Sequence, residues 1–473
     1  MPDLLVMKFG GTSVGSAERM MAACDLIADE ARKRPVTVVV SAMSKITDLL
    51  LDTTRHAEAN DQSGIDRGLE QLETRHLAAA KQLVPAESLP ALEARLTDLV
   101  AEFRRIISGM QMLAHRPPRA VDEAIAVGER LSALLISEHL QSRGIAAEAV
   151  NASEALVTDA VFNNASPLMD LTEVKAKARL MPLLNSGTIP IVTGFNGATA
   201  DGRPTTLGRG GSDFSASILA AALDASELWI WTDVDGIMTA DPRLVPDAKV
   251  LDEITYGEAA ELAYAGAKVL HPRTLAPLVV REIPVWSKNS FDPAKPGTRI
   301  VPALGVGNSG ARAVTSMANV ALLSLEPASP AVSGVHIMAR ALDALDRANV
   351  EMLAISSSSY RQSFCFLVRK DELEHATEAL ESVLALELTH GYIKGIEVDR
   401  NVGLLAVVGE GMRGFSGLAG RIFTAISRES INIIAIAQGS SELTISIVVR
   451  RDGLEKAVRA VHAECHLAAP AVY

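Results

Sequence analysis

The sequence predicts an α/β protein in which a mainly parallel sheet, sandwiched by helices, is followed by two small α+β modules. From Leu4 to about Val285, short apolar runs alternate with helical periods. Strands and helices in alternation form parallel sheets that are covered on both faces. After about residue 318 the chain repeats a shorter unit of strand, helix, strand and strand. Such an internal repeat predicts two modules that associate through their sheets.

Five apolar runs of strand length define the expected sheet, and helical periods separate them. The expected strands are Leu4–Phe9, Val36–Val40, Ile189–Thr193, Leu228–Thr232 and Ile283–Trp286. The expected helices are Ala17–Lys33, Val121–Arg143, Leu171–Leu184 and Asp213–Ala222. A further helical stretch at 65–113 has no strand nearby, so we expect it to leave the sheet. Ligands of such sheets bind in the loops beyond the carboxyl ends of the strands.

The composition changes at 292–314, which is rich in proline and glycine and weak in periodicity. We expect a first domain at 1–300, a linker at 301–318 and modules at 319–395 and 396–473. The repeat aligns Arg340–Ile355 with Arg421–Ile436, and the strands Val320–Leu325 and Leu404–Val408 precede the two copies. Whether the strand near 312–316 belongs to the first module or crosses into the second stays open.

Composition restricts the class of protein. The 473 residues are 48% hydrophobic and carry a formal net charge of -12, which argues against nucleic acid as a partner. The three cysteines, Cys24, Cys365 and Cys465, lie far from one another in sequence, so no two of them have metal-ligand spacing. No apolar run is long enough for a membrane span, and Met1-Pro2-Asp3 leads directly into a strand rather than a leader, so we expect a cytoplasmic protein. An anionic substrate then needs locally concentrated lysine and arginine.

The first of four stretches dense in small and charged residues is "KFGGTSVG" at 8–15. Its glycines, Gly10 and Gly11, let the backbone approach a ligand closely, and the following helix points its positive N-terminal end at the same space. Lys8, at the strand end, adds a full charge. The stretch fits a phosphate site, although a tight corner between strand and helix explains it equally well.

The second stretch, "TTLGRGGSDFSA" at 205–216, places Arg209 among glycines and begins a helix at Ser212 and Asp213. An arginine in a glycine turn suits bidentate capture of a carboxylate or phosphate better than packing.

The third and fourth stretches each allow two interpretations. "WTDVDGIMTADPR" at 231–243 presents Thr232, Asp233 and Arg243 in a loop after a buried strand. That loop could hold the base and ribose of a nucleotide, or it could be a solvated turn. "ELAYAGAKVLHPRTL" at 261–275 places Lys268 just after Gly266. That lysine could be a second phosphate clamp or an ordinary cation at a helix end.

Together, the four stretches resemble the aspartate kinases of the amino acid kinase family. The motifs that carry the resemblance are "KFGGTS" at 8–13, "VSAM" at 40–43, "GERLS" at 128–132, "GRGGSD" at 208–213, "TDVDGIMTADPR" at 232–243 and "GAKVLHPRT" at 266–274. The paired C-terminal modules look like the ACT domains of the same enzymes. The resemblance therefore implies the amino acid kinase fold followed by two ferredoxin-like ACT modules.

The resemblance also implies an activity, the ATP-dependent phosphorylation of the L-aspartate side chain to 4-phospho-L-aspartate. This reaction begins the pathway to lysine, threonine and methionine. A carboxylate nucleophile is already ionised at neutral pH, so no general base is required. ATP would arrive with Mg²⁺, held mainly by the phosphates.

The resemblance assigns roles to individual residues. The implied catalytic residues are Lys8, Lys268, Arg209 and Asp213. The implied ATP-binding residues are Lys8, Gly10, Gly11, Thr232, Asp233, Met238, Arg243 and Lys268. The implied aspartate-binding residues are Ser41, Thr47, Glu129, Arg209, Ser212 and Asp213, with Arg209 on the α-carboxylate and Glu129 on the α-ammonium. Lys45 and Met238 depart from the family, in which glycine and tyrosine are common at these places.

ACT pairs in this family assemble across subunits and bind end-product amino acids, usually lysine or threonine. We therefore expect a homodimer or homotetramer with an amino-acid effector. The second module reads "AQGSSE" at 437–442, but the first reads "SSSSYR" at 356–361, where relatives often have Gln-Gly-Ser-Ser-Glu or similar. This difference leaves open whether feedback inhibition is retained.

Other functions are possible. The nearest is another member of the same family, with a glutamate-type acceptor, and the non-enzyme alternative is an amino-acid sensor without catalysis. The chain shows no third domain with a Gly-x-Gly-x-x-Gly motif, so we expect no homoserine dehydrogenase activity.

Overall fold

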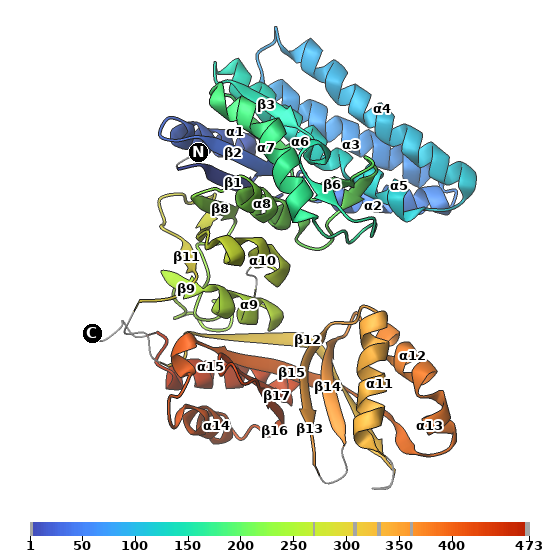
Figure 1. The fold of residues 1–473 in the computed structure, drawn as a ribbon, viewed down its shortest axis with the longest axis vertical. Coiled ribbons are helices and arrows are strands. Elements are labelled where there is room, and N and C mark those ends of the chain that lie inside the picture. Colours follow the sequence, from blue (N-terminus) through green and yellow to red (C-terminus); the bar gives the residue numbers. More distant parts are fainter. Residues whose placement is uncertain (1–2, 268–269, 306–309, 329–332, 360–362, 469–473) are drawn as a thin grey trace. The chain divides into compact units, whose positions relative to one another are not determined.

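The computed structural model describes residues 3–267, 270–305, 310–328, 333–359 and 363–468. It divides into two compact units (Figure 1). The first comprises Met1–Ile237, Asp252–Tyr256 and Leu270–Ala303, and the second comprises Met238–Leu251, Gly257–Val269 and Leu304–Tyr473. Two short segments that precede residue 300 therefore pack with the second unit.

The first unit is built on an eight-stranded sheet in the order β3-β5-β2-β1-β8-β10-β11-β9. Every neighbouring pair is parallel except β10 with β11, so the mainly parallel sheet is confirmed. The strands are β1 (Leu5–Phe9), β2 (Val36–Val40), β3 (Ala147–Val150), β5 (Ile189–Thr193), β8 (Glu227–Thr232), β9 (Glu253–Thr255), β10 (Val285–Asn289) and β11 (Thr298–Val301). All five residues of β1, β2 and β5 are buried, as expected for central strands with both faces covered.

Short strands and one hairpin escaped the sequence analysis. A separate three-stranded sheet consists of β4 (Val157–Thr158), β6 (Asn196–Thr199) and β7 (Pro204–Thr206). The strand β11 lies inside the stretch at 292–314 that we expected to be irregular, and that expectation is wrong there. Ile300 is fully buried and pairs with Val285, which explains why this part of the proline-rich stretch is ordered.

Helices flank this sheet. On one side α1 (Ala17–Ala31) packs against α6 (Val127–Ser142), and on the other α8 (Gly211–Ala222) packs against α7 (Met169–Asn185) and α10 (Pro272–Arg281). The helix expected at Val121–Arg143 is in fact two helices, because α5 (Pro118–Ile125) ends before α6 begins. Each carries a buried carboxylate that binds a different neighbour, Asp122 on α5 and Glu129 on α6, so the two helices follow different partners.

The helical stretch at 65–113 leaves the sheet, as expected. It forms α3 (Gln62–Leu83) and α4 (Leu89–Leu113), which pack along each other beside α2 (Ile46–Glu58) (Figure 1). Pro85 lies in the break between α3 and α4, where its ring prevents a continuous helix.

The second unit contains a six-stranded sheet in the order β13-β14-β12-β15-β17-β16. Its strands are β12 (Ala313–Pro327), β13 (Met352–Ser357), β14 (Phe364–Arg369), β15 (Ile393–Val408), β16 (Ile433–Gln438) and β17 (Thr444–Arg450). Its helices are α9 (Tyr256–Tyr264), which begins on the last residue of a first-unit segment, and α11 (Gly334–Arg347), α12 (Leu373–Val383), α13 (Ala385–Thr389), α14 (Leu418–Arg428) and α15 (Leu454–Glu464).

The two modules share their long strands. Residues 313–317 of β12 pair with 404–408 of β15, whereas the later part of β12 pairs with both β14 and the early part of β15. Val314 accordingly packs in the core with Ile422 and Ile447 of the second module, while Leu323 packs with Phe366 of the first. The strand near 312–316 therefore crosses into the second module, which answers the question that the sequence left open.

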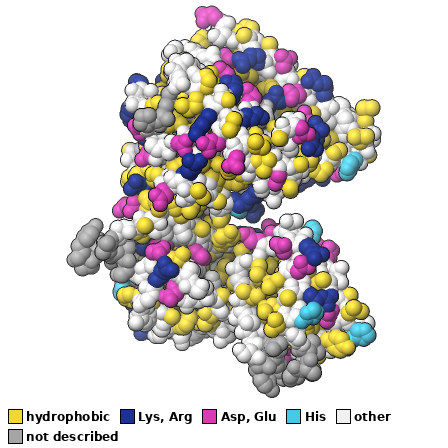
Figure 2. Space-filling model, in the orientation of Figure 1, with side chains coloured by type: hydrophobic (Ala, Val, Ile, Leu, Met, Phe, Trp, Pro, Cys, Tyr) yellow, Lys and Arg dark blue, Asp and Glu magenta, His cyan; other side chains and the backbone are white. Residues whose placement is uncertain are grey.

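On the face shown in Figure 2, basic and acidic side chains are interspersed over the first unit, and neither sign of charge dominates it. In the described part of the chain, no helix combines the length and apolar character needed to cross a membrane.

Candidate functional site

The carboxyl ends of β1, β2 and β8 meet at one edge of the sheet. The Gly10 amide donates to the carbonyl of Trp231 at 3.2 Å, and the Ser41 amide donates to the carbonyl of Phe9 at 3.1 Å. These main-chain bonds extend the parallel pairing past the strand ends. The loops that follow the three strands are therefore fixed side by side, at the edge where parallel sheets bind their ligands.

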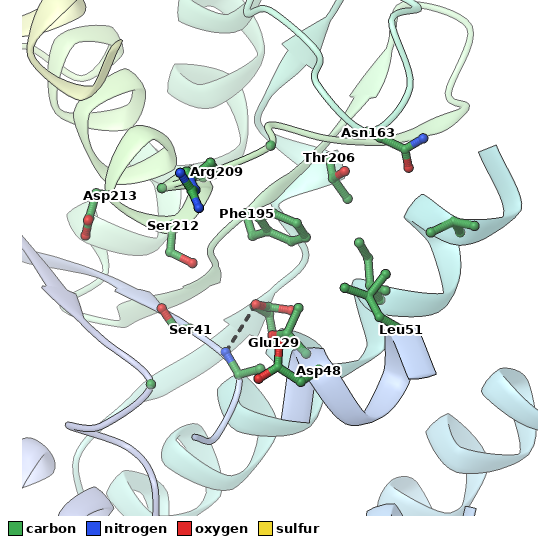
Figure 3. Close-up of a pocket in the computed structure, with 18 of the residues that line it drawn as sticks. Ser41, Asp48, Leu51, Glu129, Asn163, Phe195, Thr206, Arg209, Ser212 and Asp213 are labelled. Atoms are coloured by element: carbon green, nitrogen blue, oxygen red, sulfur yellow. Dashed lines mark hydrogen bonds between the residues drawn. The ribbon is translucent and has the colours of Figure 1, made fainter. Parts of the chain in front are cut away.

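A cavity of about 990 Å³ opens at this edge (Figure 3). The structure brings together eight of the residues that the sequence predicted for the site, which are Lys8, Gly11, Ser41, Thr47, Glu129, Arg209, Ser212 and Asp213. They come from β1, from the loop after β2, from α2, from α6 and from the start of α8. Residues separated by up to two hundred positions in sequence thus line one pocket.

Lys8 is the buried cation of the pocket. Its side chain is on β1, only 9% exposed, and its Nζ lies 2.5 Å from Oδ1 of Asp213 in the first turn of α8. The ammonium therefore has an anionic partner in the pocket, as a buried charge requires. It sits beside the Gly10 backbone, because a Cβ added to Gly10 would lie 3.4 Å from the Lys8 Nζ.

Arg209 is an exposed cation on the glycine loop before α8 (Figure 3). Gly210, the N-cap of α8, has a φ of 70°, a left-handed conformation that glycine adopts without strain. Among the residues that the structure describes, Arg209 makes no hydrogen bond or ion pair. Its five N–H donors are therefore available to an anionic ligand.

Glu129 is the opposite kind of group, a buried carboxylate with an unused oxygen. The residue is 2% exposed, and its Oε1 accepts a hydrogen bond from the Ala42 amide at 3.2 Å, the dashed line in Figure 3. Within the described residues its Oε2 has no partner. Burial raises the pKa of this carboxyl to about 8, and the hydrogen bond from Ala42 only partly offsets that rise.

Gly128 makes this arrangement possible. A Cβ at Gly128 would lie 2.8 Å from the Cβ of Ala42, so only glycine lets α6 approach the loop after β2 this closely. A buried acid that lines a cavity with one free oxygen is suited to receive a cation, because a ligand ammonium would satisfy the orphan oxygen and its charge together.

The residues predicted for the nucleotide divide between the units. Thr232 ends β8 in the first unit and Asp233 follows it, beside Gly10, whose amide donates to the carbonyl of Trp231. Met238 and Arg243 belong to the second unit, where Arg243 forms an ion pair with Asp241 at 2.6 Å. Lys268 lies outside the described residues. A shared nucleotide site for these residues remains a prediction.

Lys45 and several lining residues add features that the sequence analysis did not assign. Lys45 has a φ of 65° at the N-cap of α2, a left-handed conformation that explains why glycine is common at this place in the family. Phe195, Thr206, Asn163, Arg116 and Asp48 also line the cavity. Phe195 could have been found, because it lies two residues after the end of an expected strand, β5. Asn163 and Arg116 lie in irregular segments whose local pattern carries no signal.

Of the described carboxylates that line the pocket, Asp213 lies beside Lys8 and is already paired with it. In the part of the chain that the structure describes, no three His, Cys, Asp or Glu side chains gather as a metal cage. This donor set fits a hard cation such as Mg²⁺ that keeps water and phosphate oxygens as its main ligands.

Comparison with known proteins places these features in a family. Residues 3–289 match the model of the amino acid kinase family, and residues 331–384 and 405–465 match that of an ACT domain. The chain is 35% identical over 470 residues to the chloroplastic bifunctional aspartokinase/homoserine dehydrogenase 1 of Arabidopsis thaliana, covering 98% of this chain and 51% of that protein. It is 32% identical to the chloroplastic aspartokinase 1 of the same plant, covering 97% and 79%. The chain thus spans about half the length of the bifunctional relatives it matches.

Solved structures agree. Escherichia coli aspartokinase III in complex with aspartate and ADP superimposes with a TM-score of 0.83 at 31% identity, covering 98% of this chain and all of that one. The lysine and aspartate complex of the same enzyme gives a TM-score of 0.80 at 31% identity, covering 98% and 99%. The predicted fold, a kinase domain followed by ACT modules, is confirmed. The chain therefore belongs to the amino acid kinase family, among the aspartokinases that carry ACT domains.

Proposed function

We propose that this protein transfers the γ-phosphoryl group of ATP to the side-chain carboxylate of L-aspartate, giving 4-phospho-L-aspartate and ADP. The observation that supports this most strongly is that one pocket holds both Arg209 and the buried carboxylate of Glu129, and that among the described residues Arg209 and Oε2 of Glu129 have no partner. An α-amino acid presents one carboxylate and one ammonium, which these two groups match. The neighbours in complex with aspartate point to the same acceptor.

The reaction needs little covalent chemistry from the protein. A carboxylate oxygen of aspartate attacks the γ-phosphorus, an O–P bond forms, and the bond to the bridging β,γ-oxygen breaks so that ADP leaves with that electron pair. The nucleophile is ionised at neutral pH, so no proton has to be removed. The work of the protein is to orient both substrates and to neutralise charge on the phosphoryl group.

Lys8 on β1 and the glycine loop that follows β1 are proposed to hold the phosphates. Lys8 supplies the charge, and the amides of Gly10 and Gly11 lie where the backbone can approach closely. Lys268 is proposed as a second cation, and Thr232, Asp233, Met238 and Arg243 as nucleotide contacts. Mg²⁺, when bound, would neutralise phosphate charge. Ser41, Thr47, Ser212 and Asp213 would complete the polar lining around aspartate.

The ACT modules are proposed to make the enzyme sensitive to an end product of the pathway to lysine, threonine and methionine. A second-unit cavity of about 320 Å³, lined in part by Ser356, Ser358, Glu326 and Lys394, offers polar groups of both signs for an amino acid. The neighbour in complex with lysine supports such an effector. We further propose a homodimer or homotetramer. Assays with threonine, lysine and both together test the regulation, and full activity under all three conditions would contradict it.

The activity itself is tested by trapping the acyl phosphate. Purified protein with ATP, Mg²⁺ and hydroxylamine should form a hydroxamate with L-aspartate as acceptor. L-Glutamate is the informative competitor, because its carboxylate is one methylene further from the α-carbon. Hydroxamate formed from glutamate in preference to aspartate would favour a related kinase. No hydroxamate with any amino acid would favour a sensor without catalysis.

A further inference from the structure

We propose that Asp122, which is absent from the pocket wall, is a positioning residue for the amino-acid acceptor and acts through Asn163 and Thr206. This inference rests on the proposed aspartate kinase activity. It concerns a carboxylate for which that activity has so far supplied no role.

Asp122 is fully buried on α5 and accepts hydrogen bonds from two pocket residues. The backbone N–H of Asn163 donates to both carboxylate oxygens of Asp122, at 3.1 and 2.9 Å. Oγ1 of Thr206 donates to Oδ1 of Asp122 at 2.5 Å. Asn163 and Thr206 line the cavity (Figure 3), whereas Asp122 is not among its lining residues. One carboxylate therefore ties together two segments of the pocket wall that are about forty residues apart in sequence.

The segment that carries Asn163 has a conformation that needs support. Asn163 has a φ of 68°, in the left-handed region, which asparagine tolerates better than other residues with a Cβ but which glycine still favours more. The neighbouring Ala165 amide donates to the carbonyl of Thr206 at 2.8 Å, and Nη2 of Arg273 donates to the carbonyl of Ala165 at 3.2 Å. Asp122 holds Asn163 itself, whereas the other contacts hold the residues after it.

The same segment packs against the arginine loop. A Cβ added to Gly208, which precedes Arg209, would lie 2.7 Å from Oδ1 of Asn164, and Nη1 of Arg273 donates to that same oxygen at 2.5 Å. A displacement of the segment at 163–164 would therefore also move the loop that carries Arg209. Asp122 lies at the start of this chain of contacts.

The chemistry of Asp122 favours a positioning role over a simple packing role. Burial raises the pKa of its carboxyl, and the hydrogen bonds from Thr206 and Asn163 lower it. No described Lys, Arg or His forms an ion pair with it. A buried carboxylate without a cation is held by hydrogen bonds alone, and here its donors are residues of the acceptor pocket.

Two substitutions test the proposal in the full-length protein. Asp122→Asn keeps the shape of the side chain but replaces one acceptor oxygen by an NH2 donor. The backbone N–H of Asn163 then loses one of its two acceptors. Thr206→Val removes the hydroxyl and keeps the volume. Each should raise the KM for aspartate about tenfold, the effect expected for a lost charge-assisted hydrogen bond, and should leave the KM for ATP within about twofold. Both substitutions disturb the hydrogen bonds of the same carboxylate. The double variant should therefore raise the KM for aspartate by less than the product of the two single increases.

Two controls separate positioning from general loosening. Asp159→Asn weakens the same segment at a different point, because Oδ1 of Asp159 accepts hydrogen bonds from the backbone amides of Val161 and Ser166. Asp159 is not among the residues that line the cavity. This substitution should leave the KM for aspartate unchanged. Thr206→Ser retains the donor and should restore the wild-type KM, which keeps the proposal testable even if Asp122→Asn fails to fold.

An unchanged KM for aspartate in Asp122→Asn or Thr206→Val would overturn the inference. So would equal rises in both KM values, or the same rise in Asp159→Asn. If wild-type protein forms no aspartate hydroxamate, the proposed function fails, and this inference fails with it. Wild-type activity with unaffected variants overturns the inference alone.

Discussion

The Nζ of Lys8 lies 2.5 Å from Oδ1 of Asp213, an ion pair that joins the central strand β1 to the first turn of α8. Both side chains face the pocket, so the pair fixes the arginine loop and the glycine loop against each other. Phosphate oxygens entering beside Gly10 and Gly11 would meet an ammonium that is already oriented. Pre-organised charge of this kind needs no rearrangement during the reaction.

Replacing Lys8 should therefore affect the chemical step. We expect Lys8→Ala to lower kcat by about 10²- to 10³-fold, the usual effect of removing one pre-organised charge donor from a transition state. The KM for aspartate should change by less than about threefold, because the acceptor is held by other groups. Steady-state kinetics with both substrates varied check this. A normal kcat with a raised KM for aspartate would show that Lys8 binds the acceptor instead.

Arg209 should fail in a different way. Because it is free and exposed in the pocket, we expect Arg209→Ala to raise the KM for aspartate by about 10²-fold, the cost of losing charge-assisted hydrogen bonds to a carboxylate. Arg209→Lys should recover only part of that loss, since a lysine cannot bind a carboxylate with two parallel bonds. Equal KM values in the wild type and in Arg209→Ala would contradict the assignment.

The sequence predicted more of the residues that line the pocket than of the residues that support them. The motifs shared with the aspartate kinases predicted Lys8, Arg209 and Glu129 as site residues, and all three line the pocket. The pocket wall at Asn163 and the support from Asp122 could not be predicted, since a hydrogen bond between residues 41 positions apart leaves no local pattern. The break between α5 and α6 was missed for a related reason, because the helical period continues across it while the tertiary partners change.

Strand exchange between the modules was also beyond local reasoning. The apolar residues Ala313, Val314 and Met317 of β12 would fit the core of either module, and only the pairing with β15 decides which core they enter. Periodicity identifies a strand but not its neighbour.

Glu129 predicts a pH dependence of aspartate binding. Its carboxyl has a pKa of about 8 in the folded protein, so below that pH the free enzyme carries a neutral acid that cannot pair with an ammonium. The KM for aspartate should therefore rise by up to about tenfold per pH unit as the pH falls below 8. In Glu129→Gln the KM should be higher and independent of pH from 6 to 9. A wild-type KM that stays constant over this range would contradict the prediction.

The same carboxyl links stability to pH. Its pKa rises from 4.5 in the unfolded chain to about 8 on folding, so between these values the folded state binds more protons. Stability therefore falls as the pH rises through this window. Thermal unfolding should show that Glu129→Gln stabilises the protein at pH 9 relative to wild type and has little effect at pH 4.5. Equal differences at both pH values would show that the carboxyl does not titrate in this way.

Lys45 predicts a stabilising substitution in the pocket loop. Its φ of 65° places a residue with a Cβ in the left-handed region, at a cost of about 1 kcal/mol. Lys45→Gly should raise the free energy of unfolding by up to about that amount, whereas Lys45→Ala, which keeps the Cβ, should not. Urea unfolding of the three proteins measures the difference. Equal stabilisation by alanine would show that loss of the charge, not relief of strain, is the cause.

Val314 tests the exchange of strands between the ACT modules. It precedes the first module in sequence but packs with Ile422 and Ile447 of the second, so Val314→Ala should leave a cavity in the second core. We expect a loss of about 1–3 kcal/mol and faster hydrogen exchange at 444–450 in β17, which pairs with the second half of β15. The matched substitution Leu323→Ala, on the same strand but in the first core, should accelerate exchange at 364–369 in β14 instead. Both residues lie on β12. If β12 belonged wholly to the first module, both substitutions should accelerate exchange in β14. That shared pattern would rule out the crossing strand.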